Sequence, residues 1–228
     1  NAARVPLFDD PGTRFRYGIS ATILGRLVEI WSGQPYDQFL EERVFGPLGM
    51  TDTVFWADPS RIDRLATVYR PDAHGTLQVH QMEDIPFTEQ VPLVEGGVGL
   101  LSTTLDFARF SQLFLNGGEI DGTRILKPET VELMMENSIA DELLPIGRGG
   151  YMAASGWTLG GFAYALHPEN YDHTVSQGEV WWDGSAGTRF WIDPVNNMVT
   201  VIMAQVSPSG GNGFREDFKN RVYEALLD

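Results

Sequence analysis

The residue types that most often carry out chemistry are scarce in this chain. It contains no cysteine, which excludes disulfides, thiolate metal sites and a cysteine nucleophile. The four histidines form two pairs in polar segments, His74 with His80 and His167 with His173. Neither pair has an evident third ligand of the kind that a zinc site needs, and the acidic pairs Asp9-Asp10 and Asp141-Glu142 are typical of solvated loops. We therefore predict no metal ion and no cofactor.

A glycine-rich segment, Gly96-Gly97-Val98-Gly99, has some likeness to a phosphate-binding loop. It lacks the G-x-x-x-x-G-K pattern of such loops, and no lysine lies near it in the sequence. We interpret it as a glycine turn close to a functional site.

The charge balance excludes some partners. The 228 residues include 31 Asp and Glu against 16 Lys and Arg, which gives a formal net charge of −15. Nucleic acids and anionic membrane surfaces attract an excess of Lys and Arg, so neither is expected as a partner. No apolar run approaches the roughly 18 residues of a membrane span. The chain starts without a Met or an apolar targeting segment, so we expect a targeting peptide to be absent or removed, and the compartment stays open.

Helices are the elements that must position a site in the first two thirds of the chain. Apolar residues recur at helical spacing over about 20–32, 37–45, 103–115 and from Pro128 on. Ser20 is the predicted N-cap of the first helix, Gly46-Pro47 is the predicted stop of the second, and Thr103 and Asp106 have capping-box spacing at the start of the third. Residues 58–99 show little periodicity and predict long loops that form pocket walls.

The last third of the chain has a different period. Aromatic and β-branched runs predict strands over 157–166, 188–192 and 198–206. A final helix is predicted from an apolar stripe of Phe214, Phe218, Val222 and Leu226. This order indicates an α+β fold. We divide it into a mainly helical region with long pocket-lining loops over 1–156 and antiparallel strands plus a C-terminal helix over 157–228, both within one larger catalytic domain.

Several blocks in this order resemble the serine β-lactamase-like hydrolases. The blocks are Phe15-Arg16-Tyr17-Gly18-Ile19-Ser20, Val44-Phe45-Gly46-Pro47-Leu48-Gly49-Met50-Thr51, Gly96-Gly97-Val98-Gly99-Leu100-Leu101-Ser102-Thr103 and Trp182-Asp183-Gly184-Ser185-Ala186-Gly187-Thr188. The superfamily includes class C β-lactamases, penicillin-binding proteins of the D-alanyl-D-alanine carboxypeptidase type, and related esterases and acyltransferases. The resemblance implies an antiparallel sheet flanked by helices plus a helical region, present here as the C-terminal portion of the fold.

The resemblance also implies a set of site residues. Members of the family use a Ser-x-x-Lys nucleophile pair, a Tyr that moves protons, and a strand motif that lines the pocket. Their Tyr corresponds to Tyr17, and their strand motif to Trp182-Asp183-Gly184, a Trp-x-Gly form that is typical of the esterase branch. The backbone N–H of Ser185 would then be an oxyanion-hole donor.

This chain departs from the family at the nucleophile. It contains no Ser-x-x-Lys, because its only lysines are Lys127 and Lys219 and the residues three before them are Arg124 and Glu216. The nucleophile precedes the Tyr by well over a hundred residues in the family. We therefore expect the segment that carries it to be removed, disordered or on a second chain.

A second departure bears on the substrate. Ile19 stands where β-lactamases and peptidases have an Asn, whose amide binds the amide carbonyl of the substrate, and Trp182 stands in place of a Lys. The pocket therefore has less capacity to bind a carboxylate and more aromatic surface. Trp157 and Tyr164 are further candidates for the acyl-pocket wall. We therefore expect hydrolysis of a small-molecule ester through an acyl-enzyme. A β-lactamase, a carboxypeptidase, an acyltransferase and a non-catalytic ligand-binding or sensor member stay open as alternatives.

Overall fold

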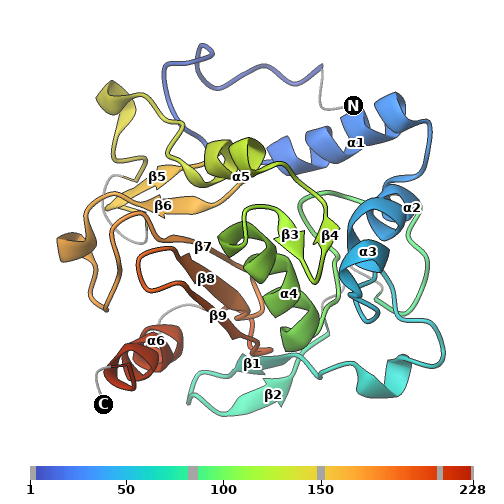
Figure 1. Ribbon diagram of the computed structural model, residues 1–228. Coiled ribbons are helices and arrows are strands. Elements are labelled where there is room, and N and C mark those ends of the chain that lie inside the picture. The colour runs from blue at the N-terminus through green and yellow to red at the C-terminus, as the bar shows by residue number, and fades with distance from the viewer. Residues whose placement is uncertain (1–3, 82–86, 148–151, 210–212, 227–228) are drawn as a thin grey trace.

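The computed structural model describes residues 4–81, 87–147, 152–209 and 213–226. Its centre is a five-stranded antiparallel sheet in the order β5-β6-β7-β8-β9 (Figure 1). The strands are β5 (Ser155–Trp157), β6 (Ala163–Ala165), β7 (Val180–Asp183), β8 (Arg189–Asp193) and β9 (Met198–Ile202). Two short hairpins lie outside the sheet, β1 (Tyr69–Pro71) with β2 (Leu77–Val79), and β3 (Glu119–Ile120) with β4 (Thr123–Arg124). The predicted α+β fold is thus confirmed.

The helices are distributed over both parts of the chain. They are α1 (Ser20–Ser32), α2 (Tyr36–Leu40), the π-helical η2 (Glu41–Phe45), α3 (Gly46–Leu48), α4 (Thr104–Leu115), α5 (Pro128–Met135) and α6 (Phe214–Glu224), with short 3₁₀ turns η3 (Ile62–Arg64), η4 (Asp141–Leu143) and η5 (Pro168–Asn170). No helix among the described residues is long and apolar enough to cross a membrane.

The sheet has a helix on each face (Figure 1). α4 packs on β8 and β9, where Phe190 and Ile192 belong to a cluster with Phe114 of the helix. α6 covers the other face, where its Phe218 packs against a cluster that contains Trp181 and Trp191. Side chains alternate between the faces along each strand, so consecutive residues of β7 and β8 serve different layers.

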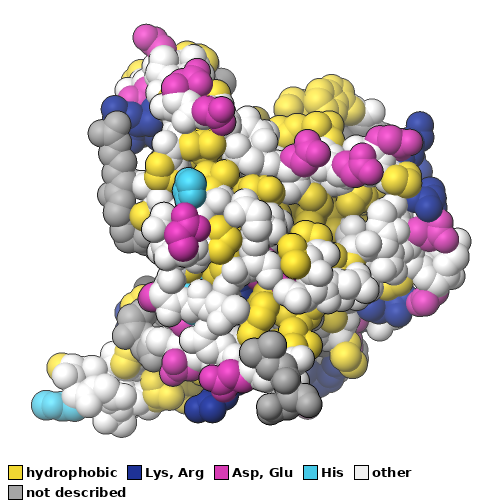
Figure 2. Space-filling model, turned by 60° about the vertical axis from the view of Figure 1, so that its left-hand side comes forward, with side chains coloured by type: hydrophobic (Ala, Val, Ile, Leu, Met, Phe, Trp, Pro, Cys, Tyr) yellow, Lys and Arg dark blue, Asp and Glu magenta, His cyan; other side chains and the backbone are white. Residues whose placement is uncertain are grey.

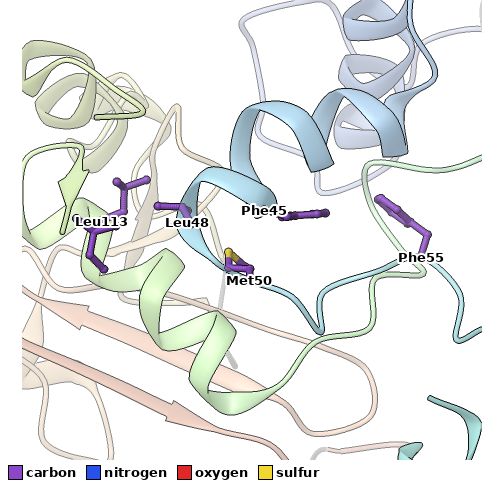
Figure 3. Packing of buried hydrophobic residues seen from close by; sticks show 6 residues of the cluster. Phe45, Leu48, Met50, Phe55 and Leu113 are labelled. Carbon is purple, nitrogen blue, oxygen red and sulfur yellow. The ribbon is translucent and has the colours of Figure 1, made fainter. Parts of the chain in front are cut away.

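A second part of the core joins the helical region to α4. Leu113 of α4 faces Leu48 and Met50 at the end of α3, and Phe45 of η2 and Phe55 extend this cluster (Figure 3). Leu113 is 58 or more residues from the other four side chains, so the cluster fixes the helical region against the sheet layer.

Of three predicted helix ends, one is confirmed and two are wrong. Thr103 Oγ1 accepts the Asp106 N–H at 3.2 Å, which confirms it as the N-cap of α4. Ser20 is the first residue of α1 rather than its cap, because Ile19 occupies the N-cap position without a side-chain hydrogen bond. The helix also continues through Gly46-Pro47, because a π-helical segment precedes it and the Gly46 N–H bonds to Glu41 O, five residues back. This wider turn accommodates a proline.

The strand predictions missed two features. The run 157–166 is not one strand, because β5 ends at Trp157 and the chain turns through Gly160-Gly161 before β6 begins. β7 was not predicted as a separate strand, although Trp182 and Asp183 lie in it.

The buried face of α6 coincides only in part with the predicted apolar stripe. Phe214 and Leu226 of the predicted apolar stripe are exposed, whereas Arg215 and Lys219 are buried against the sheet. Each of these two cations meets a carboxylate there, Asp183 and Glu179 respectively. Phe218 of the stripe does pack on the sheet, so the helix buries Phe218 together with these two paired cations.

Hydrophobic side chains also reach the surface, where they gather in several places between charged ones (Figure 2). On α1, four large apolar side chains recur at helical spacing and are exposed: Ile23, Leu24, Ile30 and Trp31. A helix normally packs such a stripe against other protein.

Candidate active site

Three of the predicted site residues meet in an aromatic cluster. Tyr17 lies three residues before α1, Trp157 is the last residue of β5, and Trp182 is the second-last residue of β7. The ring centroid of Tyr17 is 5.0 Å from that of Trp182 and 5.9 Å from that of Trp157, and the two tryptophan rings are 4.6 Å apart. Tyr17 is 61% exposed, so its hydroxyl group is open to a ligand.

The predicted oxyanion donor lies in the turn that follows Trp182. The Gly184 N–H donates to Thr188 O at 2.9 Å, and the Gly187 N–H donates to Gly184 O at 3.0 Å, which closes the turn between β7 and β8. Ser185 is exposed at its tip, and among the described residues its N–H has no acceptor. A backbone N–H without an intramolecular partner is what an oxyanion hole requires.

Gly184 fits this turn for a steric reason. A Cβ on residue 184 would lie 2.4 Å from Thr188 Oγ1, so a larger residue would require the Thr188 side chain to move. Beyond the tip, Ala186 O accepts the Val206 N–H at 2.7 Å, which anchors the turn to the segment after β9.

Asp183 points away from this cluster. It alternates with Trp182 along β7, and its carboxylate accepts a hydrogen bond from Arg215 Nη1 of α6 at 2.7 Å. Asp183 thus lies on the sheet face that α6 covers. The side chain is therefore not positioned with the aromatic rings of Trp182 and Tyr17.

Ile19 and Tyr164 lie at the margins of the site. Ile19 is exposed and lies two residues after Tyr17, at the N-cap position of α1, where its side chain makes no hydrogen bond to the helix. Tyr164 is on β6 and packs in the cluster against α4, beside Gly178. Within the described residues, the ring contacts of Tyr17 are with the two tryptophans, so Tyr164 is not brought against it.

The glycine-rich segment lies against the start of α1. A Cβ on Gly96 would be 2.3 Å from Ala21 O, and a Cβ on Gly25 of α1 would be 3.3 Å from the Gly96 nitrogen. Thr22 Oγ1 donates to Glu95 Oε2 at 3.0 Å in the same contact. The absence of a side chain at Gly96 thus lets this segment pack closely against the helix that follows Tyr17.

Other possible sites lie apart from this cluster. A cavity of about 330 Å³ opens between α2 and residues 53–61, lined partly by Phe45, Phe55 and Trp56, and none of the predicted site residues borders it. Within the described residues, no group of three or more His, Asp or Glu is arranged to hold a metal ion.

Sequence reasoning missed the charged residues behind the turn. Arg189 Nη1 donates to Glu216 at 2.9 Å, next to the pair of Asp183 and Arg215. Asp183 and Arg189 are directly opposite each other on β7 and β8. Because side chains alternate along a strand, the sequence did indicate that Asp183 and Trp182 face opposite sides of the sheet. The partner of Asp183, Arg215 of α6, is 32 residues away in the sequence, so no local pattern predicts the pair.

Comparison with known proteins places this geometry in a family. The family described as Beta-lactamase matches residues 1–223. Protein Rv1367c of Mycobacterium tuberculosis H37Rv is 33% identical over 214 residues, which cover 90% of this chain and 52% of that protein. A protein of Escherichia coli K12 named "Putative D-alanyl-D-alanine carboxypeptidase" is 31% identical over 222 residues, covering 88% of this chain and 47% of its own length. The chain thus spans about half the length of these relatives.

A solved structure supports the same assignment at the level of the fold. The LovD6 mutant of simvastatin synthase from Aspergillus terreus superimposes with a TM-score of 0.84 at 24% identity, and the match covers 98% of this chain and 58% of that one. Because the family match extends over almost all residues and the fold agrees with it, the chain belongs to the beta-lactamase family.

Proposed function

We propose that the protein is a serine hydrolase that acts through an acyl-enzyme, and that its substrate is a carboxylic ester. The observation that carries this proposal is the contact of Tyr17 with Trp182, on the strand that leads directly into the Ser185 turn. A proton-transfer group and a free backbone donor at one aromatic surface are the parts that acyl transfer needs around a reacting carbonyl.

The nucleophile in this proposal lies outside the 228 residues, because no Ser-x-x-Lys occurs in them. Two observations favour this. The relatives extend to about twice the length that the chain covers. The exposed apolar stripe of α1, just after Tyr17, is the kind of surface that further protein covers.

The reaction then proceeds in two steps. The Ser Oγ forms a bond to the ester carbonyl carbon, its proton passes through Tyr17 and the Lys to the leaving alcohol, and the ester C–O bond breaks. The Ser185 N–H stabilises the negative charge on the carbonyl oxygen in each tetrahedral intermediate. Water attacks the acyl-enzyme by the reverse proton path and releases the acid.

The choice of an ester rests on the groups around Tyr17. Ile19 offers no amide to a peptide or lactam carbonyl, and Trp182 and Trp157 present aromatic surface instead of a cation. Such a surface favours an apolar acyl or alcohol group over a carboxylate. The name of the Escherichia coli relative favours a second candidate, a D-alanyl-D-alanine carboxypeptidase.

Covalent labelling and a substrate panel test the proposal. The complete protein should react with a fluorophosphonate at one serine, whereas residues 1–228 alone should stay unlabelled. Turnover of p-nitrophenyl butyrate should exceed that of nitrocefin and of a D-alanyl-D-alanine peptide. Faster turnover of nitrocefin or of the peptide would overturn the ester assignment, and a complete protein that acquires no label would instead be a non-catalytic binder.

A further inference from the structure

The C-terminal helix α6 contacts the end of β7, the strand that carries Trp182 and leads into the Ser185 turn. On the sheet face opposite the aromatic cluster, Arg215 Nη1 of α6 lies 2.7 Å from the Asp183 carboxylate at the end of β7. The side chains of Asp183 and Arg215 are only 15% and 8% exposed. A buried, charge-assisted hydrogen bond of this kind holds its partners in a narrow range of positions.

A second ion pair holds the other side of the hairpin. Glu216, the next residue of α6, accepts a hydrogen bond from Arg189 on β8 at 2.9 Å. The Arg189 guanidinium also lies over the Trp181 ring, 4.1 Å from its centroid. Because Asp183 and Arg189 are cross-strand neighbours, the first turn of α6 bonds to both strands at the point where the Ser185 turn begins and ends.

The Gly184–Ser185 peptide is thus fixed from two directions. The bond from the Val206 N–H to Ala186 O anchors the far side of the turn, and Asp183 anchors the near side, one residue before Gly184. The peptide itself is held by backbone bonds within the turn, because Gly184 O accepts the Gly187 N–H. No described side chain hydrogen-bonds to Gly184 or Ser185, so side chains can act on the Ser185 N–H only through the neighbours of the turn.

We propose that Arg215 is a positioning residue that aims the Ser185 N–H at the carbonyl oxygen of the substrate by fixing Asp183 at the end of β7. This inference rests on the proposed function. Displacements of about 1 Å in a catalytic group can cost 100-fold in rate. Because the oxyanion bond strengthens in the transition state, loss of this alignment lowers kcat more than it raises KM.

The test uses the complete enzyme with p-nitrophenyl butyrate, with active sites counted by fluorophosphonate labelling. Arg215→Lys keeps the charge and loses the planar guanidinium, and we expect kcat per labelled site to fall about 10-fold to 100-fold with KM within about threefold. Since removal of one partner of a buried ion pair can unfold a protein, the double variant Asp183→Asn with Arg215→Gln replaces both charges by neutral groups. It should recover thermal stability and keep the low kcat.

A matched control comes from the other end of β7, where Glu179 precedes the strand and pairs with Lys219, four residues after Arg215 on α6. Glu179→Gln should lower the melting temperature and leave kcat per labelled site unchanged. If both Arg215 variants keep wild-type kcat per labelled site, the positioning role is overturned while the proposed function stands. If the wild-type protein is not labelled at all, the proposed function fails and this inference fails with it.

Discussion

Replacing Lys219 with methionine removes one half of a buried ion pair between α6 and the sheet. The Lys219 ammonium contacts the Glu179 carboxylate, and the two side chains are 1% and 0% exposed. Burial lowers the pKa of Lys219 to about 8 and raises the pKa of the Glu179 carboxyl above its ordinary range. Loss of one partner from such a pair costs about 3–5 kcal/mol, because the remaining charge is left uncompensated. For a chain of this size, that corresponds to a fall in melting temperature of about 6–20 °C.

The variant should also acquire a distinct pH dependence. Without Lys219, the pKa of Glu179 in the folded state rises further. Between the ordinary pKa of a Glu and this raised pKa, the folded protein keeps a proton on Glu179 that the unfolded chain has lost. The resulting stability is present at low pH and is lost as pH rises through the folded-state pKa. The deficit of Lys219→Met relative to the wild type should therefore be smaller at pH 5 than at pH 8.

Urea unfolding followed by tryptophan fluorescence measures this deficit at both pH values, with the slope m as a check on two-state behaviour. The control is Glu179→Gln with Lys219→Met, which should recover most of the lost stability because no unpaired charge stays buried. A loss below about 1 kcal/mol in the single variant, or a double variant no more stable than the single one, would refute this account of the contact.

Three further changes probe the site and its surroundings. Tyr17→Phe should lower kcat of the complete enzyme by at least about 100-fold, whereas Tyr69→Phe, a control on β1, should not, and unchanged turnover in Tyr17→Phe would remove that residue from the reaction. Gly184→Ala should slow fluorophosphonate labelling because its Cβ meets Thr188 Oγ1, and a second change, Thr188→Ala, should restore part of the rate. Burial lowers the pKa of His173, so the unfolded chain binds the proton more strongly than the folded protein. The free energy of unfolding should therefore fall as pH falls below about 6.5. If His173→Asn loses as much stability over that pH range as the wild type, another group is responsible.

The sequence predicted those parts of the molecule that depend on neighbours along the chain. The Thr103 cap, the end of α4 at residue 115 and the proline start of α5 depend on residues within a few positions of one another, and the structure has all three. The turn at Gly160-Gly161 was also visible as a local signal, and a single strand over 157–166 was expected only because the flanking residues are aromatic and β-branched. The Tyr17 and Trp182 assignments came from the family resemblance, and their contact at 5.0 Å required the fold.

The contacts that escaped prediction join segments that are distant in the sequence. An apolar stripe normally marks the buried face of a helix, and in the last helix that rule selected Phe214, Phe218, Val222 and Leu226. Phe218 packs on the sheet, but Phe214 and Leu226 are exposed. The rule missed Arg215, Glu216 and Lys219, which form ion pairs with Asp183, Arg189 and Glu179 of the sheet. No property of residues 214–226 alone distinguishes these charges from solvated ones.

The burial of these charged groups determines where the excess negative charge of the chain lies. Among the described residues, the buried acidic side chains are Asp106, Glu179 and Asp193, and the buried basic ones are Arg189, Arg215 and Lys219, so the two sets cancel. The excess of 15 negative charges therefore lies on partly or fully exposed positions and on residues outside the described ranges, and acidic side chains are spread over the face shown in Figure 2. A surface with a net negative charge repels anions. Under the proposed function, this repulsion favours an uncharged ester over a substrate that carries a carboxylate.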